Sequence, residues 1–227
     1  RFFTAMAHEL RTPLASLRLA AGLLVQAPPP GATEEHRQLF QLMLQSSDRL
    51  DLLINSLLDY ARLEVRHLQL DMQTIDLRPI LESVAALLEP HYRAKHQTLD
   101  ITLPEEPVNI QGDPFRLKSA VQALLDTAWK RCPEEGRLSI GCRTQDGQTL
   151  GWVCDTGAQV PEAARPHVFT RAYWQTTEDL PQLSAFGLGL PLAHGLIALH
   201  GGNLWLSEPE TEGDGMCFHF RLPLAST

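Results

Sequence analysis

The segment His8-Glu9-Leu10-Arg11-Thr12-Pro13-Leu14 decides how the rest of this sequence is interpreted. It lies in a run of apolar residues at spacings of three and four, which predicts an amphipathic helix: Phe3, Ala7, Leu10, Leu14, Leu17, Ala21 and Leu24. His8 lies off this apolar face, and Thr12 follows one turn later on the same side. A neutral imidazole is a competent nucleophile, a neighbouring Glu9 carboxylate can accept its proton, and Thr12 can position a water molecule.

The sequence that follows predicts a second helix antiparallel to the first. Three prolines within residues 26–33 end the first helix, and Thr33 followed by two glutamates favours a new helix start. The second helix has a heptad seam of Leu39, Met43, Ser46, Leu50, Leu53, Leu57 and Tyr60, and a second apolar stripe of Ile54, Leu58, Ala61 and Val65. One hairpin cannot cover both stripes, so we expect a homodimer that forms a four-helix bundle.

From residue 69 onward, helical and strand-like patterns alternate. The expected helices cover residues 77–95, 113–131 and 188–200, and Asp113-Pro114 is a typical helix start. The expected strands lie near residues 70–74, 99–103, 137–144, 150–154, 203–207 and 216–222. Helices mixed with mainly antiparallel strands predict an α+β fold, in which helices cover one face of a sheet in an α/β sandwich. We therefore expect two domains, residues 1–68 and 69–227.

Composition narrows the classes of partner. The 227 residues carry a formal net charge of −8, which argues against a protein that coats nucleic acid or anionic lipid through bulk charge. No apolar run approaches the roughly 18 residues of a membrane helix. Because the chain begins at Arg1 without an initiator methionine, we interpret it as a piece of a longer protein, so any membrane attachment would come through N-terminal regions missing here.

The four cysteines are widely spaced, and none forms a C-x-x-C pair. The sequence gives no support for zinc or for a redox couple at these positions. We expect Cys132, Cys142, Cys154 and Cys217 to be small buried hydrophobic residues in a reducing compartment.

The string H-E-L-R-T-P at the head of a heptad hairpin resembles the phosphoacceptor box of bacterial sensor histidine kinases. The resemblance covers essentially the whole chain. It implies a dimerisation and phosphotransfer hairpin followed by an ATP-binding domain of the type shared with DNA gyrase, Hsp90 and MutL. It also implies that His8 is phosphorylated, that Glu9 is the acid/base, and that Thr12 serves dephosphorylation of a partner response regulator. Such a chain would be the cytoplasmic portion of a membrane-anchored sensor.

The same resemblance identifies parts of the nucleotide site. Asp155-Thr156-Gly157 looks like the first glycine box, where the aspartate accepts from the adenine amino group and the glycine allows close backbone approach. Gly187-Leu188-Gly189 looks like the second, which presents a helix N-terminus to phosphates. Phe169 and Arg171 resemble the segment that anchors the ATP lid. The family's glycines are replaced by Gln159 and Ala185.

The asparagine box departs furthest from the family pattern. Residues 123–130 match its leucines, alanine and lysine, but both asparagines are absent, and Ala123 and Thr127 stand in their places. Mg²⁺ prefers hard oxygen ligands, so the Thr127 hydroxyl is the candidate metal ligand, with a shorter reach than an amide. Lys130 can still meet phosphate charge.

Three functions follow from these observations. The leading hypothesis is a homodimeric histidine kinase that binds ATP and Mg²⁺, phosphorylates His8, and transfers the phosphoryl group to the receiver domain of a response regulator. The alternative is a degenerate kinase that acts as a response-regulator phosphatase or scaffold with weak or no ATP turnover, and with metal binding weakened. An unrelated helical-hairpin interaction module remains as a third possibility.

Overall fold

The computed structural model describes residues 2–64, 68–170, 173, 188–207 and 215–225, with the backbone alone for residues 2–12, 45, 48–49, 51–53, 56 and 64. The chain divides into two compact units, Arg1–Leu68 and Gln69–Thr227. Within the described residues, none of the helices has the length and apolar character needed to span a lipid bilayer.

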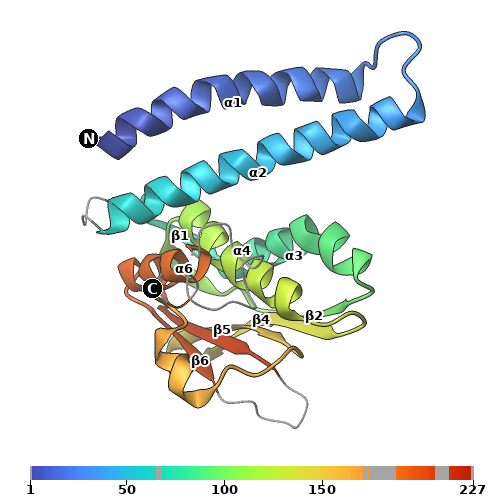
Figure 1. Ribbon diagram of the computed structural model, residues 1–227. Coiled ribbons are helices and arrows are strands. Elements are labelled where there is room, and N and C mark those ends of the chain that lie inside the picture. Colours follow the sequence, from blue (N-terminus) through green and yellow to red (C-terminus); the bar gives the residue numbers. More distant parts are fainter. Residues whose placement is uncertain (1, 65–67, 171–172, 174–187, 208–214, 226–227) are drawn as a thin grey trace. The chain divides into compact units, whose positions relative to one another are not determined.

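The first unit is a helical hairpin of α1 (Phe2–Gln26) and α2 (Glu34–Glu64), which pack against each other (Figure 1). Both helices are confirmed, and α1 continues through Pro13. Thr33 fixes the start of α2. The Thr33 hydroxyl accepts from His36 N at 3.3 Å, and the Thr33 backbone N–H donates to His36 Nδ1 at 3.1 Å. These reciprocal bonds satisfy backbone donors that a helix start otherwise leaves unpaired.

The hairpin keeps much of its apolar surface in contact with solvent. Leu39, Met43 and Leu50 of the predicted seam are each about half exposed. Leu17, Leu19, Leu23 and Leu42 are more than half exposed as well. A run of exposed leucines of this kind on a helical hairpin is typical of a surface that is covered by a partner.

The second unit is built on a five-stranded sheet with the order β2-β4-β5-β7-β6. Its strands are β2 (Thr98–Thr102), β4 (Arg137–Gln145), β5 (Gln148–Asp155), β6 (Asn203–Ser207) and β7 (Cys217–Pro223). All neighbours are antiparallel except β2 and β4, which are parallel. Strands β1 (Gln73–Asp76) and β3 (Asn109–Gly112) form a separate two-stranded antiparallel sheet.

Three helices cover one face of the five-stranded sheet: α3 (Leu77–Ala94), α4 (Pro114–Arg131) and α6 (Gly189–Leu199) (Figure 1). A short 3₁₀ helix, Glu162–His167, follows β5. The sheet's inner face is closely packed: a Cβ at Gly151 of β5 would lie 2.1 Å from the Phe220 ring of β7. The α+β sandwich is thereby confirmed. The sequence missed β3, because four residues are too few for a period-two pattern to stand out.

The N-terminus of α4 is capped by Asp113, which also links this helix to two other segments. Asp113 Oδ1 accepts from Phe115 N at 3.0 Å and Arg116 N at 3.1 Å, so the predicted cap is confirmed. Its Oδ2 accepts from Asp71 N at 3.1 Å, and its own N–H donates to His200 Nε2 at 3.0 Å. Burial lowers the pKa of His200. One buried aspartate thus joins α4, the segment before β1 and the end of α6.

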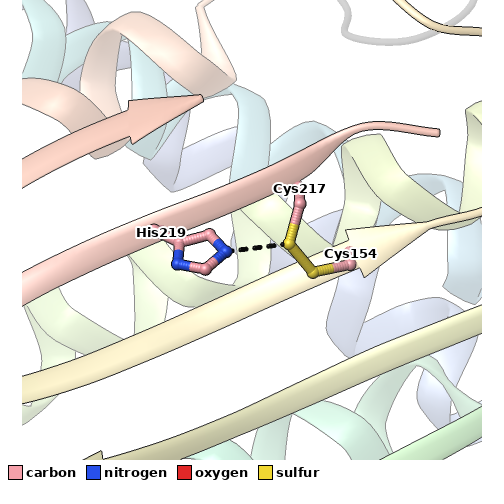
Figure 2. A group of neighbouring side chains, drawn as sticks. All are labelled: Cys154, Cys217 and His219. Atoms are coloured by element: carbon pink, nitrogen blue, oxygen red, sulfur yellow. Dashed lines mark hydrogen bonds between the residues drawn. A yellow bond between two sulfur atoms is a disulfide. The ribbon is translucent and has the colours of Figure 1, made fainter. Parts of the chain in front are cut away.

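The prediction for the cysteines is half wrong. Cys132 and Cys142 are buried thiols, as expected, and burial raises the pKa of Cys142 to about 12. Cys154 and Cys217, however, lie opposite each other on β5 and β7 and form a disulfide (Figure 2). Sequence spacing could not reveal this pair, because 63 residues separate the two cysteines and only the strand register places them side by side.

Replacing Asp113 tests the role of this cap. In Asp113→Ala the unfolding free energy should fall by about 1–2 kcal/mol, because the first turn of α4 loses its acceptor. Urea unfolding followed by circular dichroism measures the change. The matched control is Asp100→Ala on the exposed β2 edge, which should change stability by less than about 0.5 kcal/mol. Equal effects of the two substitutions would contradict this role for Asp113.

Candidate functional site

Asp155 is the last residue of β5 and is only 3 % exposed. Its backbone is fixed on both sides, because Asp155 N donates to Met216 O and Gly215 N donates to Asp155 O, each at 2.9 Å. Its side-chain Oδ1 accepts from Gly157 N at 2.7 Å. Its Oδ2 is buried and accepts no hydrogen bond from any described residue. A buried carboxylate oxygen without a donor is costly, and such atoms are exceptional in native proteins.

Two glycines pack directly against this carboxylate. A Cβ at Gly157 would lie 2.7 Å from both Asp155 Oδ1 and Arg131 O. A Cβ at Gly215 would lie 2.4 Å from Gly157 O and 2.7 Å from Asp155 Oδ1. Gly157 was predicted, whereas Gly215 was missed. Its role depends on the pairing of β7 with β5, which no local pattern in the sequence specifies.

The electrostatics of Asp155 follow from its burial. Loss of solvent raises the pKa of Asp155 to about 6, while the Gly157 N–H, the Arg131 charge and the Met216 backbone each act to lower it. The side chain therefore ionises near neutral pH at a cost in folding free energy. A ligand that donates a hydrogen bond to Oδ2 would offset that cost.

An exocyclic amino group fits this vacant acceptor. The adenine N6 carries two hydrogens and needs an acceptor when it is removed from water. Asp155 offers such an acceptor in Oδ2, and the close packing at the two glycines holds its other oxygen, Oδ1, in place. The site's own chemistry is thus suited to a nucleobase with an amino group.

The C-terminal end of α4 borders the same loop. The Arg131 guanidinium donates to Ala158 O, and Thr156 Oγ1 accepts from Arg137 N at 3.0 Å. Lys130 Nζ lies 2.5 Å from Asp126 Oδ2, one turn earlier on the helix, and 5.7 Å from the centre of the Trp129 ring. The cation predicted to meet phosphate is therefore bound to a carboxylate in this structure.

Two oxygen-bearing side chains near the same end of α4, Thr127 and Asp126, are also hydrogen-bonded within the helix. Thr127 is buried, and its hydroxyl donates to Ala123 O at 2.8 Å. Asp126 accepts from Trp129 Nε1 at 3.0 Å through Oδ1 and from Lys130 through Oδ2. A magnesium ion requires hard oxygens that converge on an octahedron. As arranged here, Thr127 and Asp126 do not fit that requirement.

Of the residues predicted to face the phosphates, Leu188 and Gly189 are among the described residues. Gly189 is the first residue of α6, and Leu188 precedes it as a buried residue without a side-chain cap. The N-cap residue of α6 therefore supplies no side-chain acceptor to the first turn of this helix. Gly187 and Arg171 lie outside the described residues. Phe169 stacks on His194 of α6, with ring centres 5.1 Å apart, and contacts Phe218 of β7 at 6.2 Å.

The predicted phosphoacceptor residues lie in α1. His8, Glu9 and Thr12 are helical, but their side chains are outside the described part of the structure. Their roles stay predictions.

Two family comparisons cover most of the chain. Residues 1–66 match the His Kinase A (phospho-acceptor) domain, and residues 112–226 match the histidine kinase-, DNA gyrase B- and HSP90-like ATPase family. The chain belongs to the histidine kinase family. The resemblance seen in the H-E-L-R-T-P string is thereby confirmed, and so is the order of the two modules.

Named histidine kinases are similar over nearly the whole chain. The adaptive-response sensory kinase SasA of Prochlorococcus marinus (strain AS9601) is 30% identical over 99% of this chain and 58% of its own length. The alginate biosynthesis sensor protein KinB of Pseudomonas aeruginosa is 29% identical over 98% of this chain and 36% of its own length. The crystal structure of full-length ShkA in complex with AMPPNP has a TM-score of 0.75 and 27% identity, over 99% of this chain and 46% of that one. This histidine kinase chain thus spans only about a third to three fifths of these relatives.

The raised pKa of Asp155 predicts a pH-dependent stability difference in this histidine kinase chain. A group with a raised pKa favours folding below its unfolded value of 3.8 and loses that contribution as pH rises through about 6. Asp155→Asn cannot ionise. The variant should therefore gain about 3 kcal/mol of unfolding free energy relative to the wild type between about pH 4 and pH 8.

Urea unfolding at several pH values measures this gap, and effects of other titrating groups cancel in the difference. Asp100→Asn is the matched control, because the Asp100 side chain is exposed. The difference in unfolding free energy between this variant and the wild type should not change with pH. A flat gap for Asp155→Asn as well would contradict the buried, ionised state assigned to Asp155.

Proposed function

We propose that this chain is the catalytic core of a two-component sensor histidine kinase. It binds ATP in the second unit, phosphorylates His8, and passes the phosphoryl group to an aspartate in the receiver domain of a response regulator. The observation that carries the proposal is the buried Oδ2 of Asp155, which has no donor in the described part of the chain, at the residue that the family's first glycine box assigns to adenine. Membership of the histidine kinase family and the HELRTP string support phosphoryl transfer from ATP to a histidine as the reaction.

The residues then take the following roles. Asp155 accepts from the adenine amino group, and Gly157 allows the ring to approach the backbone. Gly187, Leu188 and Gly189 direct the N-terminal N–H groups of α6 at the phosphates. Phe169 anchors the ATP lid by packing on α6 and β7, and Arg171 follows it in the lid. Lys130 leaves Asp126 to meet phosphate charge.

At the hairpin, the phosphotransfer chemistry is carried by three residues of α1. A ring nitrogen of His8 attacks the γ-phosphorus, the bond to the β-phosphate oxygen breaks, and ADP leaves. Glu9 accepts the imidazole proton as the new N–P bond forms. Thr12 positions the water that later hydrolyses the phosphorylated aspartate of the response regulator.

We infer that magnesium contributes less here than a complete asparagine box would allow. Thr127 stands where the resemblance places the family's metal-binding asparagine, yet its hydroxyl donates to Ala123 O, and Asp126 is paired with Lys130. Transfer of a phosphoryl group relies on positioning and on neutralisation of charge by metal. Phosphorylation should therefore suffer more than adenine binding.

This arrangement favours a second candidate function. A chain that binds nucleotide but turns it over slowly can still dock a response regulator on the hairpin and dephosphorylate it with Thr12. The paired oxygens of Thr127 and Asp126 are the observation that favours this function. It keeps the same two domains, residues 1–68 and 69–227, and the same partner.

The hairpin is also proposed to form the homodimer. Its half-exposed seam residues Leu39, Met43 and Leu50 would be buried in a four-helix bundle with a second copy. In the parent protein, this core would be the cytoplasmic portion of a membrane-anchored sensor, attached through regions N-terminal to the sequence. No nucleic-acid partner is proposed.

The first test concerns the phosphoacceptor. Incubation with γ-labelled ATP and Mg²⁺ or Mn²⁺ should give an acid-labile, alkali-stable label that is absent in His8→Gln. His36→Gln, an exposed histidine of the same hairpin, should keep the label. Label that persists in His8→Gln would contradict the kinase proposal. A wild type without label that still dephosphorylates an acetyl-phosphate-charged receiver domain, and loses this in Thr12→Ala, would support the second candidate.

The second test concerns the dimer. Light scattering on the eluting peak of a size-exclusion column should give twice the chain mass of 25.3 kDa for the wild type. Leu50→Glu combined with Leu57→Glu should shift the mass to that of a monomer, because two charges would be buried in the seam. Leu87→Glu makes the same change at an exposed leucine of α3 and should leave the dimer intact. A wild-type monomer would contradict the proposed bundle.

A further inference from the structure

Cys154, Cys217 and His219 lie together on the face of the sheet opposite the helices. Cys154 on β5 is the register partner of Cys217 on β7, and His219 follows two residues along β7, so all three side chains project to one side (Figure 2). His219 Nε2 lies 3.0 Å from Cys217 Sγ. The two sulfurs and an imidazole nitrogen are all within 4.8 Å of one another. Elsewhere in the described ranges, no three His, Cys, Asp or Glu side chains converge in this way.

Two sulfurs and one imidazole nitrogen are a ligand set for a soft cation. Zinc binds sulfur at about 2.3 Å and histidine nitrogen at about 2.0–2.1 Å, which keeps its ligand atoms roughly 3.4–3.8 Å apart. The backbone already places the three residues as a cross-strand pair plus an i, i+2 neighbour. Rotation of the side chains alone can therefore open the group to that spacing once the sulfurs are not bonded to each other.

The disulfide controls whether these ligands are available. A dithiol reductant breaks the S–S bond, delivers two electrons and two protons to the two sulfurs, and is itself left as a disulfide. The resulting thiols lose their protons when they bind a metal. In the oxidised form neither sulfur is a thiolate, and the site is closed.

The surroundings hold the imidazole in place and keep the site open to solvent. His219 is the register partner of Trp152 on β5 and of Trp205 on β6. The Trp205 and His219 ring centres are 5.7 Å apart. All three ligand residues are partly exposed, so a cation can enter and a water molecule can complete the tetrahedron. Asp155 projects to the opposite face of β5, so this site is separate from the nucleotide site.

We propose that the reduced chain binds one soft divalent cation of the zinc class through Cys154, Cys217 and His219, and that the Cys154–Cys217 disulfide closes this site. The proposal does not depend on ATP binding or on phosphotransfer. The sequence gave no sign of it, because the ligands come from strands that are far apart in the chain.

Cobalt(II) is the probe, because thiolate coordination gives it an intense near-ultraviolet charge-transfer band and tetrahedral geometry gives it strong visible bands. The full chain is reduced with dithiothreitol, freed of reductant under anaerobic conditions, and titrated with Co²⁺. We expect both bands to saturate at one Co²⁺ per chain, to persist in excess Mg²⁺, and to disappear when Zn²⁺ displaces the cobalt. The oxidised chain should give neither band.

Single variants identify the ligands. Cys154→Ser, Cys217→Ser and His219→Gln should each weaken Co²⁺ binding by at least about tenfold, since loss of even an outer-shell partner costs about 10–100-fold. The control, Cys132→Ala with Cys142→Ala, removes the two other thiols and should bind Co²⁺ like the wild type. Urea unfolding of each variant shows that it is folded.

Two results would overturn the proposal. One is a reduced, folded chain without a thiolate-to-cobalt band, which would leave the pair as a disulfide only. The other is a band that survives Cys154→Ser and Cys217→Ser, which would place the cation elsewhere.

Discussion

The proposed nucleotide site depends on one electrostatic constraint, a carboxylate held out of water with one of its two oxygens unpaired among the described residues. Asp155 Oδ1 accepts from Gly157 N, while Oδ2 is buried and has no donor among the described residues. This arrangement raises the pKa of Asp155 to about 6 and costs folding free energy at neutral pH. The surrounding backbone maintains it: β7 and the segment before it fix the backbone of Asp155, and the packing at Gly157 and Gly215 leaves no room for a Cβ beside Oδ1. Such a cost is typical of a binding site, because the ligand supplies the missing donor.

The metal side of the same site is organised differently. Thr127, the proposed metal ligand, donates to Ala123 O of its own helix, and Asp126 pairs with Lys130. In the proposed site, Asp155 thus keeps an acceptor for the base, whereas the oxygens of Thr127 and Asp126 are already bonded within α4. Because binding of the base and neutralisation of the phosphates are separable contributions, a chain of this kind can bind nucleotide and still transfer phosphate slowly. The two candidate functions differ only in how much phosphoryl transfer is slowed relative to nucleotide binding.

Local patterns predicted most of the secondary structure and the order of the modules. Heptad spacing gave α2, and the Asp113-Pro114 pair gave the start of α4, since both depend on neighbours in the chain. Features that arise from strand register were missed: Gly215 against Gly157, and Cys154 opposite Cys217. The burial of Asp155 was likewise beyond the sequence, because the D-x-G string names the residue without its surroundings. Of the predicted site, Asp155 and Gly157 lie in contact, whereas Gly187, Arg171 and the side chains of His8, Glu9 and Thr12 lie outside the described residues.

Calorimetric titration with ADP, with and without Mg²⁺, tests this account most directly. The wild type should bind ADP with a Kd that changes by less than about threefold when Mg²⁺ is replaced by EDTA, because the base supplies most of the affinity. Asp155→Asn should weaken binding by about tenfold or more, since the hydrogen bond to the charged Oδ2 is lost. Binding that requires Mg²⁺, or that is unchanged in Asp155→Asn, would contradict the assignment of nucleotide recognition to the buried carboxylate.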